Sequence, residues 1–255
     1  MTARGDAQAH AVSEPGPDPG PDPGPVREHR AEGTLTLTLD RSERGNALAA
    51  DLVEALLGAV QRASADASLH TLVLRGAGRH FCTGLDLSDL DQLRDGDLLH
   101  RLVRIETLLA ALWHAPWRTV AVAQGRAWGA GADLVAVCEH RIALPGATFR
   151  FPGAQFGIVL GTRRLAERLG VDRARALVTT GGEIDAAAAL AQGLATAADD
   201  APLPPPRVAP ATAAALRAAT RADHRDADLA ALVRSAAEPG LVARVAAYRA
   251  GLQRG

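Results

Sequence analysis

The chain has 255 residues, of which 47% are hydrophobic and only 3% aromatic, and its formal net charge is −1. This length allows one large domain or one domain with an appendage, and the near-neutral charge gives no reason to expect nucleic acid or an anionic membrane as a partner. All 28 basic residues are Arg, which excludes chemistry that depends on Lys, such as a Schiff base, a P-loop or a Ser–Lys dyad.

The first 27 residues are predicted to form a tail outside the fold. Residues 14–25 read EPGPDPGPDPGP, and Pro at every second position prevents both a helix and a strand ladder. The tail lacks the apolar segment of a signal peptide, and the chain contains no run of about 18 apolar residues. The only two cysteines, Cys82 and Cys138, are isolated, which favours a reducing compartment. We therefore expect a cytoplasmic protein.

Residues 28–200 are predicted to form the core domain, in which short strands alternate with helices. The clearest strand signal is TLTLTL at 34–39, which alternates with the period of two of a half-buried strand. Other apolar segments predict strands at 71–74, 119–123 and 141–143, and helices at 47–63, 88–113, from about 130, and over 162–196 with a break at Gly170. This alternation favours an α/β fold.

Residues 201–255 are predicted to be a linker followed by helices. The segment 202–210 is rich in Pro, and 211–253 is rich in Ala and Arg with little apolar bulk. Such helices bury little surface on their own. They are expected to pack on the core domain or on another subunit.

Two glycine-rich turns follow predicted strands, at 81–87 and 125–133, and three interpretations of them compete. A dinucleotide fingerprint is one, because Gly76-x-Gly78 follows a strand, but Phe81 replaces its third glycine. Simple closure of strand-to-helix turns is the second. In the third, backbone N–H groups from both turns point at a developing negative charge, as in an oxyanion site.

Several motifs in order resemble the enoyl-CoA hydratase/isomerase (crotonase) superfamily over roughly residues 33–200. The segment R-x4-NAL at 41–48 resembles its RPxxxNAL motif, and RGAGRHFCTGLDL at 75–87 resembles GxGxxFCAGxDL. Further along, QGRAWGAGADL at 124–134 resembles NGxAxGGGxEL, and CEHRIA at 138–143 resembles CDxRIA. The stretch FRFP…GI at 149–158 resembles FxxPE…LGI.

The resemblance implies a spiral of ββα units with a C-terminal helical trimerisation region, and a homotrimer or hexamer. It implies an acyl-CoA thioester as substrate, with coenzyme A as part of that substrate and no separate cofactor. No side chains show metal-ligand spacing on a helix face, so no metal is expected. The family's oxyanion hole, carried over, consists of the amides of Leu85 and Ala130, which follow Gly84 and Gly129.

The resemblance places only one of the family's two catalytic glutamates on an acidic residue. The first maps to Asp133, and the second maps to Gly153; no Asp or Glu occurs between His140 and Ala166. A positioned proton-transfer group contributes on the order of 10²–10⁴-fold in rate. Efficient hydration is therefore not expected, whereas double-bond isomerisation or dehydration is compatible with one carboxyl group.

Other residues carry weaker expectations. Trp128 is expected to line the acyl pocket or to pack in the core, and Arg44 and Arg79 to contact the CoA phosphates or solvent. Asp133 has a purely structural alternative, as an acid in the first turn of a helix whose dipole keeps its pKa low, whereas burial beside an acyl chain would raise that pKa; the sequence leaves the balance open. Asp86 is expected to cap a helix after the first turn rather than to act as a base.

Three functional hypotheses follow. The first is a lyase or isomerase of lipid metabolism that stabilises a thioester enolate with the amides of Leu85 and Ala130 and moves a proton with Asp133. The second is a catalytically impaired acyl-CoA binder or assembly partner. The third, a Ser-dependent hydrolase, is disfavoured because the chain has no GxSxG motif and Ser88 has no evident base.

Overall fold

The computed structural model describes residues 24–252. The predicted tail therefore lies outside the described residues up to residue 23, and its last residues belong to the fold. Strand β1 (Val26–Ala31) pairs antiparallel with β2 (Thr34–Leu39). The predicted boundary at residue 27 is wrong by two residues, because β1 is a largely exposed edge strand whose sequence, VREHRA, does not alternate.

A five-stranded sheet forms the centre of the fold, with the strand order β1-β2-β3-β4-β6. Strands β2, β3, β4 and β6 run parallel to one another. The added strands are β3 (Thr71–Gly76), β4 (Arg118–Ala123) and β6 (His140–Ala143). The prediction of an α/β fold with strands in these four places is confirmed.

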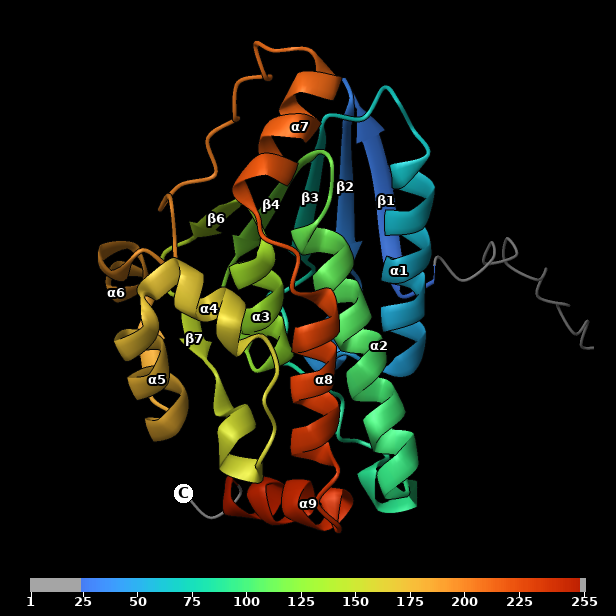
Figure 1. Ribbon diagram of the computed structural model, residues 1–255, viewed down its shortest axis with the longest axis vertical. Coiled ribbons are helices and arrows are strands. Elements are labelled where there is room, and N and C mark those ends of the chain that lie inside the picture. The colour runs from blue at the N-terminus through green and yellow to red at the C-terminus, as the bar shows by residue number, and fades with distance from the viewer. Residues whose placement is uncertain (1–23, 253–255) are drawn as a thin grey trace, which may run out of the picture.

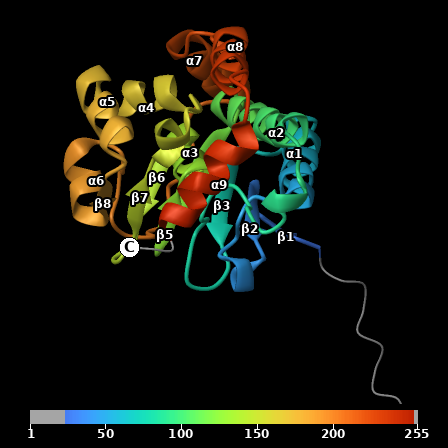
Figure 2. The same cartoon turned by 90° about the horizontal axis from the view of Figure 1, so that it is seen from below.

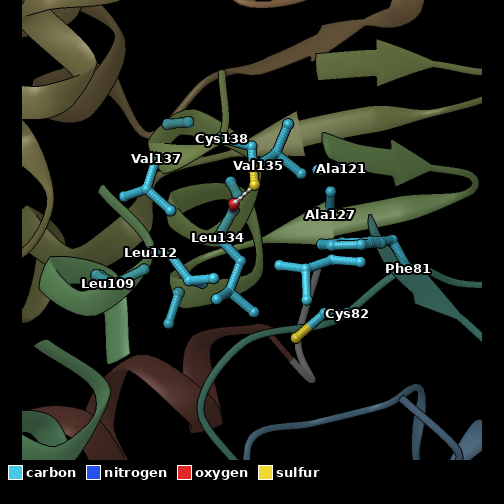
Figure 3. Close-up of a cluster of buried hydrophobic side chains, with 14 of the residues drawn as sticks. Phe81, Cys82, Leu109, Leu112, Ala121, Ala127, Leu134, Val135, Val137 and Cys138 are labelled. Atoms are coloured by element: carbon cyan, nitrogen blue, oxygen red, sulfur yellow. Dashed lines mark hydrogen bonds between the residues drawn. The ribbon is translucent and has the colours of Figure 1, made fainter. Parts of the chain in front are cut away.

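Helices α1 (Ala50–Ser64), α2 (Asp95–Trp113) and α3 (Ala130–Val137) cover one face of this sheet (Figures 1 and 2). The alternation in β2 explains the packing, because Leu35, Leu37 and Leu39 are fully buried in the main core. Figure 3 shows where α3 joins that core, with Leu134 beside Leu109 and Leu112 of α2. Helix α3 is buried along its whole length, and half of its residues are Ala or Gly.

The predicted helix at 88–113 begins only at Asp95. A short 3₁₀ turn, η2 (Leu90–Gln92), precedes it. The helix starts where the Asp97 carboxylate accepts a hydrogen bond from the backbone N–H of Arg94 at 3.0 Å. The seven residues before it instead form the loop that leaves the first glycine-rich turn.

A second, three-stranded sheet has the order β5-β7-β8 and was not predicted. Its strands are β5 (Arg126–Trp128), β7 (Thr148–Arg150) and β8 (Glu183–Asp185). Strands of three residues are too short to show a period of two. The 3₁₀ segments η1 (Ser42–Arg44) and η3 (Pro152–Phe156) lie in the connections.

The remaining helices complete the chain. Helices α4 (Thr162–Leu169) and α5 (Val171–Thr180) meet at Gly170, which has φ +81°, so the predicted break is confirmed. They are followed by α6 (Ala186–Gln192), α7 (Pro210–Thr220), α8 (Arg225–Ala236) and α9 (Leu241–Leu252).

The two last helices pack on the core of the same chain. Helix α8 lies against α2, and α9 crosses the end of α2 beside η2 and η3 (Figures 1 and 2). Leu241 and Val245 of α9 join a second apolar cluster with Leu98 and Leu102 of α2. Of the helices within residues 24–252, none combines the length and apolar character needed to cross a membrane.

Candidate active site

The first glycine-rich turn is fixed by the buried side chain of Asn46. Its amide nitrogen donates to the carbonyl oxygens of Ala77 and His80 at 2.9 and 2.8 Å, and its oxygen accepts from the N–H of Arg41 at 2.9 Å. Asn46 itself has φ +54°, a conformation that Asn tolerates better than most residues. The NAL motif therefore holds the loop that leads into the turn.

The backbone N–H of Leu85 points away from Leu48. Leu48 donates to the Gly84 carbonyl at 2.7 Å and accepts from the N–H of Asp86 at 3.3 Å, forming a parallel bridge opposite Leu85. In a parallel bridge the N–H and C=O of the residue in between face the other way. The N–H of Leu85 thus faces the side on which β5 and Trp128 lie.

The second turn places Ala130 at the start of α3. Ala130 is the first helical residue after Gly129, which has φ +54°. N–H groups in the first helical turn have no acceptor inside their own helix, and the helix dipole adds positive charge there. The amide of Ala130 is therefore a suitable donor for an anionic oxygen.

Two glycines allow these turns to touch. A Cβ on Gly84 would lie 2.7 Å from the Trp128 carbonyl oxygen and 3.5 Å from the Ala130 nitrogen. A Cβ on Gly131 would lie 2.3 Å from the Cys82 carbonyl oxygen. Any side chain at these positions would separate the turns, so these glycines serve close backbone approach rather than turn closure alone.

The dinucleotide interpretation of Gly76-x-Gly78 is wrong. After β3 the chain enters the Phe81 turn and reaches its next α-helix only at Asp95. A dinucleotide fingerprint needs a helix that opens directly at the glycines, so that its N-terminus meets the pyrophosphate. Gly76 is needed for packing instead, because a Cβ there would lie 2.4 Å from the Phe81 carbonyl oxygen.

A cavity of about 240 Å³ lies where the two turns meet. Six of the predicted site residues line it, namely Gly84, Leu85, Trp128, Gly129, Ala130 and Asp133. Most of the other lining residues are apolar and come from η3, the loop before α4, and helices α2, α5 and α9. Both predicted amide donors and the predicted acid therefore belong to one cavity.

Asp133 is the only acidic residue among the described residues that line this cavity. It is the fourth residue of α3 and is only 5% exposed. Burial raises its pKa well above the ordinary value, which outweighs the lowering effect of the Arg164 charge. Of the two opposing effects that the sequence left open, burial is therefore the larger one.

The Asp133 carboxylate is held against the N-terminus of α4. A Cβ on Gly161 would lie 2.1 Å from its Oδ1, so only glycine leaves room for this carboxylate. Among the described residues no hydrogen bond contributes to the Asp133 pKa. A carboxyl group with a raised pKa in an apolar cavity is a suitable group to take up and release a proton during a reaction.

A buried ion cluster lies near this acid. Arg164 of α4 and Glu106 of α2 are 1% and 3% exposed, and two hydrogen bonds of 3.0 and 2.5 Å join them. Asp228 of α8 lies 3.1 Å from the same guanidinium. This cluster ties three helices together beside the cavity.

The other predicted residues are placed as follows. Trp128 lines the cavity and donates from Nε1 to the Thr148 hydroxyl at 3.0 Å; it is only partly buried and belongs to none of the apolar core clusters within residues 24–252. Arg44 and Arg79 are exposed and do not line the cavity; their contact with CoA phosphates stays a prediction. Asp86 accepts from the N–H of Ser88 at 2.8 Å within the loop, and the predicted helix cap is wrong because η2 begins only at Leu90 and α2 at Asp95.

Sequence reasoning missed the residues that α9, η3 and β7 contribute. Val245 and Tyr248 of α9 line the cavity, and the Tyr248 ring lies 5.1 Å from that of Phe156 in η3. Arg150 at the end of β7 lines it as well. Tyr248 is the only tyrosine of the chain, and its position in an Ala- and Arg-rich helix was the one available signal.

Within residues 24–252, no group of three or more His, Cys, Asp or Glu side chains is arranged to hold a metal ion. The cysteines are buried, and burial raises the pKa of Cys82 and Cys138 to about 12. Neither thiol is therefore a ready nucleophile.

Comparison with known proteins gives a consistent result. The family model described as enoyl-CoA hydratase/isomerase matches residues 29–202. A probable enoyl-CoA hydratase of Mycobacterium leprae is 37% identical over 172 residues, which are 65% of this chain and 68% of that protein.

Solved structures agree with this match. A candidate enoyl-CoA hydratase/isomerase of Bordetella parapertussis is 42% identical with a TM-score of 0.83, and the match covers 89% of this chain and 98% of that one. An enoyl-CoA hydratase of Bacillus halodurans, 22% identical over 88% of this chain and 99% of its own, shares the fold with a TM-score of 0.75.

Proposed function

Because this chain belongs to the enoyl-CoA hydratase/isomerase (crotonase) family, we propose that its cavity binds the acyl part of a coenzyme A thioester. The observation that carries the proposal is that the amides of Leu85 and Ala130 and the carboxyl group of Asp133 belong to one mostly apolar cavity. The apolar lining suits an acyl chain, and the amides suit the thioester oxygen.

In the proposed mechanism the thioester carbonyl oxygen accepts hydrogen bonds from the amides of Leu85 and Ala130. When a proton leaves the carbon next to the carbonyl, negative charge develops on that oxygen, and fixed donors in a dry site stabilise it. The positive end of α3 adds to this stabilisation at Ala130. Gly84 and Gly131 position the donors by allowing the turns to meet, and the positive φ of Gly129 sets the start of α3.

Asp133 is the proposed proton carrier. Its raised pKa lets it accept the proton from carbon as a carboxylate and return it as a carboxylic acid, at the same carbon or at another. One such group is enough for double-bond isomerisation, in which a single proton is moved. Dehydration of a suitable substrate needs a group of the same kind, whereas rapid hydration benefits from a second one.

A direct test is turnover of short enoyl-CoA thioesters by the wild type and by Asp133→Asn. The proposal predicts a loss of about 10²–10⁴-fold in kcat, with the dissociation constant of a saturated acyl-CoA unchanged. Equal turnover by the two proteins would remove Asp133 from the mechanism.

A second candidate function is a non-catalytic acyl-CoA binder or assembly partner. Gly153 supports it, because this residue lines the cavity where the family has its second glutamate. Calorimetric binding of butyryl-CoA, without turnover of any enoyl-CoA or hydroxyacyl-CoA in a panel, would favour it over the enzyme.

On the sequence alone we also propose a cytoplasmic location, coenzyme A contacts from Arg44 and Arg79, and self-association into trimers or hexamers. Light scattering coupled to size-exclusion chromatography measures the oligomer directly. A monomer at micromolar concentration would rule the self-association out.

A further inference from the structure

Arg150 is the only basic residue among the described residues that line the cavity. It is half-buried at the end of β7, and its backbone oxygen accepts a hydrogen bond from the N–H of Gly129 at 2.8 Å. Apart from Asp133, the rest of the lining is uncharged. Within the part of the chain that the structure describes, Arg150 is therefore the one basic residue that contributes to this mostly apolar lining.

The guanidinium group of Arg150 is held by a ring and a carbonyl rather than by an acid. Its carbon lies 5.1 Å from the centroid of the Trp128 ring, and its Nε donates to the Gly181 carbonyl at 3.3 Å. Glu183 lies opposite Arg150 in the β7–β8 ladder. Glu183 is exposed, and within the described part of the chain no ion pair joins it to Arg150.

Tyr248 of α9 lies in the field of the same guanidinium. Burial raises the pKa of Tyr248, while the charge of Arg150 lowers it by less. The hydroxyl therefore keeps its proton at neutral pH and can donate a hydrogen bond. Arg150 and Tyr248 together offer several donors to one region of the cavity.

We propose that Arg150, assisted by Tyr248, binds a carboxylate at the far end of the acyl group, so that the preferred ligand is the thioester of a short dicarboxylic acid. This inference rests on the proposed function. A planar guanidinium matches a carboxylate with two parallel hydrogen bonds, and it costs free energy to leave such a cation half-buried without an anion.

The size of the cavity favours a short acyl group. Its volume of about 240 Å³ lies below the roughly 300–1,000 Å³ of cavities that hold drug-sized ligands. Because Arg150 lines the same cavity as Asp133, a carboxylate bound by Arg150 belongs to the acyl group rather than to the coenzyme A phosphates.

Calorimetric titration with two five-carbon saturated thioesters tests this inference, because neither thioester can be hydrated. Glutaryl-CoA carries the far carboxylate and valeryl-CoA does not. We expect the wild type to bind glutaryl-CoA about 10- to 100-fold more tightly, the range of a hydrogen-bonded charged group. In Arg150→Met the preference is lost while the affinity for valeryl-CoA is unchanged.

Arg126→Met is the matched control. The Arg126 guanidinium carbon also lies over the Trp128 ring, at 4.3 Å, but Arg126 does not line the cavity. This variant is expected to keep the full preference for glutaryl-CoA. Arg150→Lys, which retains the charge without the planar fork, is expected to keep part of it, and it replaces the Met variant should that protein not fold.

Repeating the titrations with glutaryl- and valeryl-pantetheine, which lack the coenzyme A phosphates, distinguishes binding of the acyl carboxylate from binding of a phosphate. A preference that persists there supports the inference. Equal binding of both CoA thioesters by the wild type overturns it and leaves the proposed function intact. Equal weakening of both by Arg150→Met assigns Arg150 to the phosphates and also overturns it, whereas absence of binding by either thioester overturns the proposed function itself.

Discussion

Substitution of Gly84 by Ala tests whether the two glycine-rich turns must touch. Gly84 has φ +94°, and a Cβ there would lie 2.7 Å from the Trp128 carbonyl oxygen. To reach an ordinary contact of 3.4 Å, the second turn must move by about 0.7 Å. Displacements of about 1 Å in a reactive site cost about 10²-fold in rate, so we expect kcat/KM to fall by about 10- to 100-fold.

Gly146→Ala provides the matched control for this substitution. Gly146 has a similar φ of +82°, but a Cβ there meets nothing within 4 Å. It measures the conformational cost alone, about 1–2 kcal/mol, which corresponds to a Tm loss of about 2–4 °C per kcal/mol in a protein of this size. Gly84→Ala carries the same cost plus about 1–3 kcal/mol for the overlap.

Differential scanning calorimetry and turnover of a short enoyl-CoA measure the two effects. We expect Gly84→Ala to melt below Gly146→Ala and to be the only one of the two with impaired catalysis. If both variants melt together and both retain wild-type turnover, the backbone approach at Gly84 does not form the site as described.

Three further predictions concern buried groups. The Asp133 pKa is higher in the folded protein than its unfolded value of about 3.9; the folded state thus binds more protons, and the wild type loses stability as the pH rises above about 4. Asp133→Asn avoids this loss, and its Tm advantage in melts at successive pH values should grow with pH; an advantage that stays constant or shrinks would contradict the raised pKa. Arg164→Met leaves the buried Glu106 charge without its partner and should lower the free energy of unfolding, measured with urea, by about 3–5 kcal/mol. Combining it with Glu106→Leu should restore much of that stability; a double variant no more stable than the single one would refute this. Cys82 and Cys138 should not react with a thiol reagent at pH 8 unless the protein is unfolded, because burial raises the pKa of both to about 12; rapid labelling of the native protein would show that they are accessible.

The fold could be predicted wherever the pattern is long enough to show a period. The strand at Thr34–Leu39 was predicted with its observed bounds because its leucines alternate into the core. The edge strand β1 was missed because its side chains are exposed, and the strands of the second sheet were missed because each has three residues. In these cases the backbone ladder, and not the side-chain pattern, defines the strand.

Glycine spacing located the two turns in the sequence but left their role open. The resemblance to the crotonase superfamily assigned Leu85, Ala130 and Asp133 to one site, and they line one cavity. Arg150 and Tyr248 could not be found in this way, because their position depends on how β7 and α9 close over the cavity. The pKa of Asp133 depended on burial, which only the folded chain determines.

Proton exchange at the carbon next to the thioester carbonyl measures enolate formation without requiring the natural substrate. Butyryl-CoA incubated with the wild type in D₂O should lose its α-proton signal in the NMR spectrum, and with Asp133→Asn it should keep it while still binding. Tight binding of butyryl-CoA by the wild type without any exchange would contradict the proposal that these two amides and this carboxyl group stabilise an enolate.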